Sequence, residues 1–305
     1  MVQESVAGVL SRLGVRNLGV FRGRDAVNQG VTRNQLRGAI DTGVIARVLP
    51  DTYRMTAAPV SDEQWLRAAL LWAGDIAAAA GQSGGAVYGL EGVRAARPEI
   101  VVPRATSRLR SPQVVVHRST NPQALMIRRW RGIRVTGMEA TLLALGAALD
   151  SEAFEIACED ARRRRLTSVS ALRAYIDRFG SKGVPGVSAT RRLLAQIDPV
   201  HPSRSTLEVK ARRLLVATRI TDFVREFPLE WNGRTFPFDF AFPAHRTILE
   251  TNGRRWHDDP VDYEDDNEKW SVPGRYGYKL VLATWDKVVR RPGELVDELR
   301  RTLAA

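Results

Sequence analysis

The sequence predicts a multidomain α+β protein, and three observations lead to this fold class. The chain has 305 residues, about twice the length that one hydrophobic core usually organises. Amphipathic stretches with helical periodicity and short alternating or valine-rich runs follow one another along it, as in proteins that combine helices with sheets. Segments rich in glycine and proline, above all 198–203, interrupt the pattern. We therefore expect three domains, over residues 1–57, 58–198 and 199–305.

The charge balance favours a polyanionic partner. The chain carries 46 Lys and Arg residues against 34 Asp and Glu residues, a formal net charge of +12. Eleven of the twelve excess positive charges precede residue 199, and nucleic acid is the simplest polyanion for such a surface. The single cysteine, Cys158, excludes an internal disulfide framework and a cysteine-clustered zinc site. No apolar run is long enough to cross a bilayer or follows a basic start, so we expect a cytoplasmic protein without a membrane partner.

The first segment has the order of elements of a winged helix-turn-helix. Residues 2–13 place valines and leucines on one helical face, and a short second helix fits 24–29. Thr32 and Gln35 have the spacing of a capping box, which opens a third helix. Residues 44–55 then have the pattern of a hairpin. Three helices followed by a hairpin favour this DNA-binding motif.

The third helix carries the candidate DNA contacts. Arg33, Asn34 and Arg37 fall on its polar face, and these residue types pair with guanine and adenine edges in a major groove. The alternative is that they are solvated positions on a surface helix. The helix start at 30–37 and the hairpin at 43–54 resemble the N-terminal domain of type IV, AbiEi-like antitoxins. This resemblance implies a winged helix that binds double-stranded DNA.

The middle segment predicts a mixed α/β domain without a catalytic constellation. Capping boxes at 61–64 and 136–139 open apolar helices, while 99–103 and 113–119 are valine-rich strands. The four arginines at 162–165 either complement the dipole at a helix end or contact phosphate. The order of these elements resembles the middle of AbiEi-like antitoxin proteins.

The last segment places carboxylates where two strands meet. Residues 235–242 alternate, with phenylalanines on one face and Asp239 on the other. Residues 246–252 form the next strand, and the tight turn makes the two antiparallel neighbours, so that Asp239 and Glu250 converge at one end of the sheet. Glu208, in the first turn of the preceding helix, adds a third oxygen. The phenylalanines of the shared face are Phe236, Phe238, Phe240 and Phe242.

Converging carboxylates are hard oxygen ligands of the kind that magnesium requires. A strand-end acid pair neutralised by Arg or Lys is the structural alternative. Six ordered blocks then make the segment recognisable: Glu208 in its helix, Phe238–Ala241, Leu249–Gly253, Trp256–His257, Tyr263–Asp266 and Gly277–Leu282. Together they resemble the very-short-patch-repair endonuclease-like proteins, a branch of the PD-(D/E)xK nuclease superfamily. The resemblance covers about 203–305 and implies a restriction-endonuclease-like α/β domain with a mixed sheet.

The resemblance also assigns roles to single residues. Asp239 matches the metal-binding aspartate, and Glu250 matches the second acid of the endonuclease motif. Asn252 stands where the superfamily often has lysine, which leaves the water-activating role open. His257, from the Trp-His block, is the best candidate for this role or for assisting departure of the leaving oxygen, because an unperturbed histidine titrates near pH 6.5. Lys279 on a later strand could substitute.

These features predict a bacterial DNA endonuclease that depends on Mg²⁺ or Mn²⁺ and is targeted by its winged helix. Its metal ligands would be Asp239, Glu250 and Glu208. The alternative is a non-enzymatic DNA binder: an antitoxin or transcriptional autoregulator of a type IV toxin–antitoxin-like system, with a degenerate nuclease domain and a cognate toxin as partner. The approach of the three carboxylates to metal-bridging distance discriminates between the two.

Overall fold

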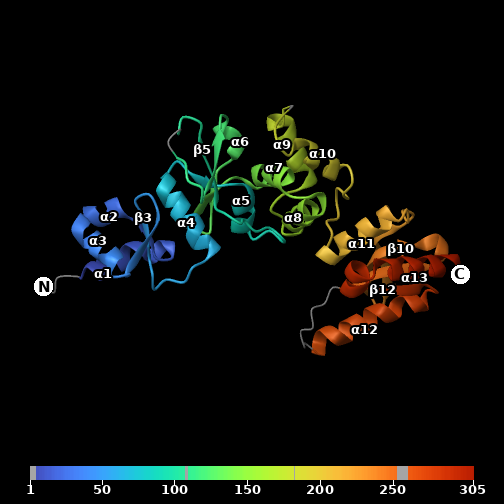
Figure 1. The fold of residues 1–305 in the computed structure, drawn as a ribbon. Helices are drawn as coiled ribbons and strands as arrows, with labels where there is room; N and C mark the ends of the chain where they lie inside the picture. Colours follow the sequence, from blue (N-terminus) through green and yellow to red (C-terminus); the bar gives the residue numbers. More distant parts are fainter. Residues whose placement is uncertain (1–4, 107–108, 182, 253–259) are drawn as a thin grey trace. The chain divides into compact units, whose positions relative to one another are not determined.

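The computed structural model describes residues 5–106, 109–181, 183–252 and 260–305, with the backbone alone for 260–267 (Figure 1). The protein is a mixed α+β chain with three sheets. It forms two compact units, Met1–Ile197 and Asp198–Ala305. In the part of the chain that is described, no helix combines the length and apolar character needed to cross a membrane.

The N-terminal part of the first unit is a three-stranded antiparallel sheet with three helices. Its elements are α1 (Val6–Gly14), β1 (Val20–Arg22), α2 (Gly23–Asn28), α3 (Arg33–Asp41), β2 (Ile45–Leu49) and β3 (Thr52–Met55), with strand order β1-β3-β2. The expected capping box opens α3: the Gln35 N–H donates to Thr32 Oγ1 at 3.2 Å, and the Thr32 N–H donates to Gln35 Oε1 at 2.8 Å. The strand β1, which the sequence pattern did not indicate, pairs with the hairpin.

This part shares a hydrophobic core with the next helix, α4 (Asp62–Ala73). Val20 and Leu49 pack in the same cluster as Leu66 of α4. The Gln64 side chain also donates to the carbonyl of Leu18 at 2.6 Å. The first two predicted segments therefore belong to one compact unit, within which the division at residue 57 stays a prediction.

The rest of the first unit is a five-stranded sheet with helices around it. Its strands, in the order β6-β5-β4-β8-β7, are β4 (Ala78–Ala79), β5 (Glu99–Pro103), β6 (Val115–Ser119), β7 (Arg128–Trp130) and β8 (Ile133–Val135). Its further helices are α5 (Gly81–Tyr88), α6 (Pro122–Leu125), α7 (Met138–Ala148), α8 (Ser151–Arg163), α9 (Val169–Phe179) and α10 (Val187–Leu194). The capping box expected at 136–139 is wrong: Gly137 is the N-cap of α7, and the Thr136 hydroxyl is hydrogen-bonded to that of Thr141, 2.7 Å away.

The arginine run at the end of α8 is engaged inside the unit. Arg162 is buried and pairs with Glu159 at 2.7 Å. Arg163 and Arg164 both pair with Asp160, at 2.6 and 3.1 Å. Arg164 also donates to two backbone carbonyls at the end of α5, at 2.8 and 3.0 Å. Arg164 therefore joins α8 to α5, and all three side chains form ion pairs within the unit, which disfavours the phosphate-contact interpretation for these three residues.

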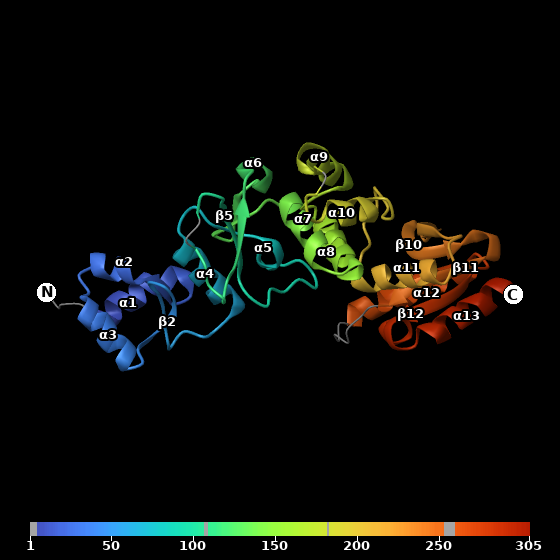
Figure 2. The ribbon, with the colours of Figure 1, turned by 45° about the horizontal axis from the view of Figure 1, so that its top comes forward.

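The second unit is a four-stranded mixed sheet covered by helices on both faces (Figure 1 and Figure 2). Its elements are α11 (Thr206–Ala217), β9 (Val224–Trp231), β10 (Arg234–Phe242), β11 (Thr247–Asn252), α12 (Pro260–Arg275), β12 (Lys279–Thr284) and α13 (Pro292–Ala304). The strand order is β12-β11-β10-β9, with β11 and β12 parallel and the other pairs antiparallel. Helices α11 and α13 share a core with one face, and α12 packs on the other.

The prediction that four phenylalanines share one face of β10 is wrong. Phe236 and Phe238 pack in the core under α12, whereas Phe240 and Phe242 pack in the core under α11 and α13. Side chains of a regular strand alternate between faces, so residues 236, 238, 240 and 242 would normally lie together. The face changes at Asp239, which lies between the two pairs.

An irregularity in the neighbouring strand accompanies this change of face. Glu226 of β9 lies opposite Asp239, and its backbone has a left-handed conformation, with φ 51°. Such a conformation is uncommon for a residue other than glycine and costs roughly 1–3 kcal/mol. The regular pleat of the β9–β10 pair is therefore interrupted at these two acidic residues.

Candidate metal centre in the second unit

Three carboxylates meet at the irregularity of the sheet. Glu208 comes from the first turn of α11, Glu226 from β9 and Asp239 from β10. One oxygen of each lies within 4.8 Å of the others. Oxygen ligands of one Mg²⁺ or Ca²⁺ ion, held 2.0 to 2.6 Å from the cation, lie at most about 5 Å apart. The three oxygens are thus spaced as ligands of a single divalent cation would be.

Glu208 is fixed by contacts to both of its oxygens. Ser205 caps α11 by accepting from the Glu208 N–H at 3.1 Å, which starts the helix here. Arg225 donates to Glu208 Oε1 at 2.7 Å, and the Arg204 N–H donates to Oε2 at 2.5 Å. Burial raises the pKa of Glu208, the neighbouring Asp239 raises it further, and Arg225 opposes the rise.

Glu226 is held at one oxygen only. Its Oε2 pairs with the Arg204 guanidinium at 2.5 Å. Its Oε1 is buried and has no hydrogen-bond partner in the described part of the chain. A buried acceptor without a partner costs roughly 1–3 kcal/mol, so this oxygen would be stabilised by a cation, a proton or a water molecule. This oxygen makes the carboxylate cluster suited to bind one of these ligands.

Asp239 is oriented by the next strand, β11. Its Oδ2 accepts from the Thr251 N–H at 2.8 Å and also from the Thr251 hydroxyl. Its own N–H donates to Glu250 Oε2 at 3.0 Å. The structure therefore brings Asp239 and Glu250 together across the β10–β11 pair, at the end of the sheet where the sequence placed them.

Glu250 forms an ion pair with a lysine of α12, the helix that packs on one face of the sheet. The Lys269 ammonium of α12 contacts Glu250 Oε1 and lies 5.1 Å from the centre of the Phe238 ring. Burial raises the pKa of Glu250 to about 7, and Asp239 adds to the rise, although Lys269 opposes it. A carboxyl group with such a pKa can accept or donate a proton near neutral pH.

Comparison with known proteins gives distant similarities. No family model matches the chain. The uncharacterized proteins MT2308 and Rv2248 of Mycobacterium tuberculosis are each 28% identical to it over 123 residues, which is 40% of this chain and 45% of theirs. The chain thus matches about half the length of these curated relatives.

Two solved structures are also similar to the chain. The catalytic domain of homing endonuclease I-Bth0305I matches with a TM-score of 0.27 and 16% identity, over 33% of this chain and 95% of that one. The RV2827C protein from Mycobacterium tuberculosis matches with a TM-score of 0.44 and 18% identity, over 72% and 82%. Similarity at this level establishes neither a family nor an activity.

The structure changes one member of the expected ligand set. Asp239 and Glu208 lie together, but the third carboxylate within 4.8 Å of both is Glu226 rather than Glu250. One sequence signal could have found it. Glu226 and Asp239 are equally far from the Asn232-Gly233 turn. In a hairpin with regular pairing, two residues at equal distances from the turn lie opposite each other.

The remaining catalytic candidates were Asn252, Lys279 and His257, and the structure places none of them in the carboxylate cluster among the described residues. Asn252 is half-buried at the last position of β11. Lys279 pairs with Thr247, three residues before Glu250, so its backbone lies about 10 Å from Glu250 along the strand direction. The lysine that reaches Glu250 comes from α12 instead. His257 lies outside the described residues.

The candidate DNA contacts belong to the first unit. Arg33, Asn34 and Arg37 are exposed on α3, while Leu36 enters the core. Within the described ranges none of the three polar side chains has a hydrogen-bond or ion-pair partner. They are accessible to a ligand, and contact with DNA stays a prediction.

Proposed function

We propose that the second unit hydrolyses phosphodiester bonds of double-stranded DNA with Mg²⁺ or Mn²⁺, and that α3 of the first unit contributes to DNA binding. The observation that carries the proposal is the group of Glu208, Glu226 and Asp239 within 4.8 Å of one another. The ion pair between Glu250 and Lys269 lies on the adjoining strand and helix. Metal ligands and a proton-handling group are the two components that such hydrolysis needs.

The side chains fit a hard divalent cation. Carboxylate oxygens are the ligands that Mg²⁺ and Mn²⁺ prefer. Glu226 Oε1, which has no hydrogen-bond partner in the described ranges, offers a buried ligand atom. Thr251 holds Asp239 in place through two hydrogen bonds. A cation bound here would supply Lewis-acid stabilisation of the phosphate charge and lower the pKa of a water molecule.

Glu250 and Lys269 supply the proton chemistry in this proposal. The pKa of about 7 allows Glu250 to accept a proton from the attacking water at neutral pH. The Lys269 ammonium orients that carboxylate and adds positive charge where the phosphate becomes more negative. It thereby takes the role that a lysine at position 252 would have had. His257 stays the candidate for assisting the leaving oxygen.

A specific observation favours the second candidate, a DNA-binding protein without catalysis. Arg225 pairs with Glu208 at 2.7 Å, and Arg204 pairs with Glu226 at 2.5 Å. A cation would have to compete with these arginines for the carboxylates. Two carboxylates neutralised by arginines would also suit a nuclease fold that is retained only for DNA binding, as in an antitoxin or transcriptional autoregulator.

Incubation with supercoiled and mismatched DNA, with and without Mg²⁺ or Mn²⁺, tests the proposal. The parent should nick DNA only with metal, and Asp239→Asn should slow cleavage about 10²-fold or more, the scale expected when one stabilising group is removed. Asp222→Asn is the matched control, because Asp222 is exposed on the same unit; it should cleave as the parent does. Cleavage that is equal in Asp239→Asn would refute the proposal. DNA binding without metal binding or cleavage would support the second candidate.

A further inference from the structure

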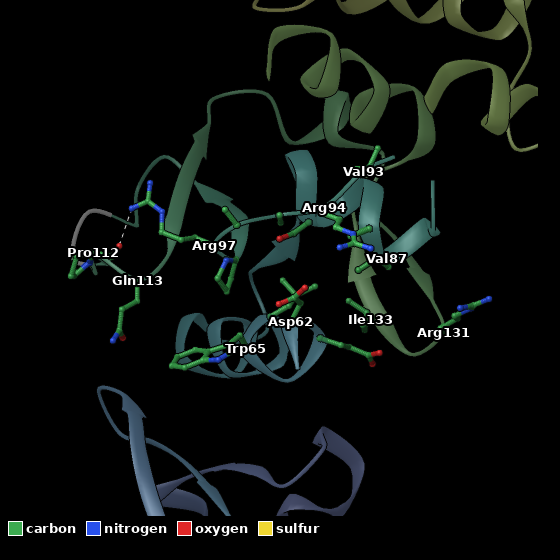
Figure 3. A pocket seen from close by; sticks show the side chains of 17 residues that line it. Asp62, Trp65, Val87, Val93, Arg94, Arg97, Pro112, Gln113, Arg131 and Ile133 are labelled. Carbon is green, nitrogen blue, oxygen red and sulfur yellow. Dashed lines mark hydrogen bonds between the residues drawn. The ribbon is translucent and has the colours of Figure 1, made fainter. Parts of the chain in front are cut away.

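A cavity of about 660 Å³ lies in the first unit, between α4, α5 and the segment that precedes β5 (Figure 3). Trp65, Leu66, Val87, Val93 and Ile133 contribute its apolar lining. The volume lies within the range of about 300–1,000 Å³ that is usual for small-molecule sites. The cavity belongs to a different unit from the carboxylate cluster and has no part in the proposed function.

Two side chains of opposite charge face each other across this cavity. Figure 3 shows Arg94 pointing into it from one side and Asp62, at the start of α4, from the other. Both are exposed, and in the described part of the chain neither has an ion-pair or hydrogen-bond partner. Of the other charged side chains that line the cavity, Glu63 pairs with Arg67 at 2.7 Å and Arg97 donates to a backbone carbonyl at 3.0 Å. Figure 3 shows the third, Arg131, pointing away from the cavity.

The signs of these two charges and the apolar lining define the ligand chemistry. A ligand needs an anionic group for Arg94, hydrogen-bond donors for Asp62, and an apolar body that fills the space beside Trp65. A free amino acid satisfies the two charges but leaves most of the volume and apolar lining empty. A nucleotide satisfies all three requirements, because its phosphate pairs with a guanidinium and its base stacks on an aromatic ring.

The Asp62 carboxylate, which would face the nucleobase, selects among the nucleotides. A carboxylate only accepts hydrogen bonds. Guanine presents two adjacent N–H donors on one edge, whereas adenine and cytosine present one amino group beside an acceptor nitrogen. We propose that this cavity binds a guanine mononucleotide, with the base on Asp62 and the phosphate on Arg94.

Calorimetric titration of the full chain with GMP, AMP and guanosine tests this site. EDTA is present throughout, so that no divalent cation links the nucleotide to the carboxylate cluster. GMP should bind at least about 10-fold more tightly than AMP, the effect of losing one hydrogen bond to a charged group. Arg94→Gln should weaken GMP binding about 10-fold or more and leave guanosine binding unchanged. Asp62→Asn should weaken both.

Two matched variants control for charge and folding. Arg192→Gln and Asp75→Asn remove the same charges at exposed positions that do not line the cavity, and they should bind GMP as the parent does. Circular dichroism verifies that each variant is folded. The proposal is overturned by absence of GMP binding at millimolar concentration, by equal affinity for GMP and AMP, or by GMP binding that neither Arg94→Gln nor Asp62→Asn weakens.

Discussion

The raised pKa of Glu250 makes the stability of the second unit depend on pH. Its carboxyl has an ordinary pKa of 4.5 in the unfolded chain and about 7 in the fold. The folded state therefore binds the proton more tightly than the unfolded state does. The resulting stabilisation is fully present below pH 4.5 and is lost as the pH rises through 7. Glu250→Gln removes the titrating group and should remove this dependence.

The size of the effect follows from the two pKa values. At about 1.36 kcal/mol per pKa unit, the change from 4.5 to about 7 corresponds to about 3 kcal/mol between acidic and alkaline limits. Between pH 5 and pH 8 the linkage relation gives most of this free-energy difference. It corresponds to a change of the order of 10²-fold in the equilibrium constant for opening of the second unit. The estimate applies to a nearly buried group, since the Glu250 side chain is 8% exposed.

Amide hydrogen exchange of peptides from β10 and β11 measures this difference locally. The ratio of protection in Glu250→Gln to protection in the parent cancels the intrinsic pH dependence of exchange. Between pH 5 and pH 8 this ratio should rise of the order of 10²-fold in favour of the variant. If the substitution itself lowers the free energy of unfolding, it does so equally at every pH. The slope of the protection ratio against pH therefore stays the same.

A ratio that does not change with pH would show that Glu250 stays ionised throughout, and the assignment of its proton-accepting role would fail with it. Peptides from α9 provide the internal control. They lie in the first unit, and their protection should be the same in both proteins at each pH.

Four further outcomes are expected. Thr251→Val removes a hydroxyl that holds Asp239 and should weaken Mn²⁺ binding about 10- to 100-fold in calorimetry; unchanged affinity would contradict the metal assignment. Arg37→Ala should cost about 1–3 kcal/mol of DNA binding and reduce its salt dependence in anisotropy titrations. His257→Ala should keep DNA and metal binding but slow single-turnover cleavage roughly 10²- to 10⁴-fold, and an unchanged rate would remove its role. Gly186→Ala should lower the free energy of unfolding by about 2 kcal/mol or more in thermal denaturation, because φ is 86° and a Cβ would lie 1.8 Å from a backbone oxygen of α7.

Local features of the fold were predictable because they depend on residues close in sequence. The Thr32 capping box needs two side chains three residues apart, and it forms as expected. The turn between β10 and β11 is short, so the meeting of Asp239 and Glu250 followed from strand alternation and pairing.

The rest of the site depends on tertiary packing and on an irregular backbone. Glu250 meets Lys269 only because α12 packs over the sheet, a contact between residues 19 positions apart with no local signal. Glu226 has a backbone conformation that sequence propensity disfavours. The regular alternation that placed all four phenylalanines on one face fails at the same point.

Glu226 combines a left-handed backbone with a buried oxygen that lacks a partner among the described residues. Glycine would adopt this conformation without steric cost, and asparagine would adopt it at little cost. The glutamate therefore lowers stability twice, and random substitution would tend to replace it once nothing selects for its carboxylate. Relatives that have abandoned cation binding should accumulate glycine or asparagine at this position while they keep Phe238 and Phe240. An alignment of such relatives would thus record, at one column, where in the lineage the proposed cation binding was lost.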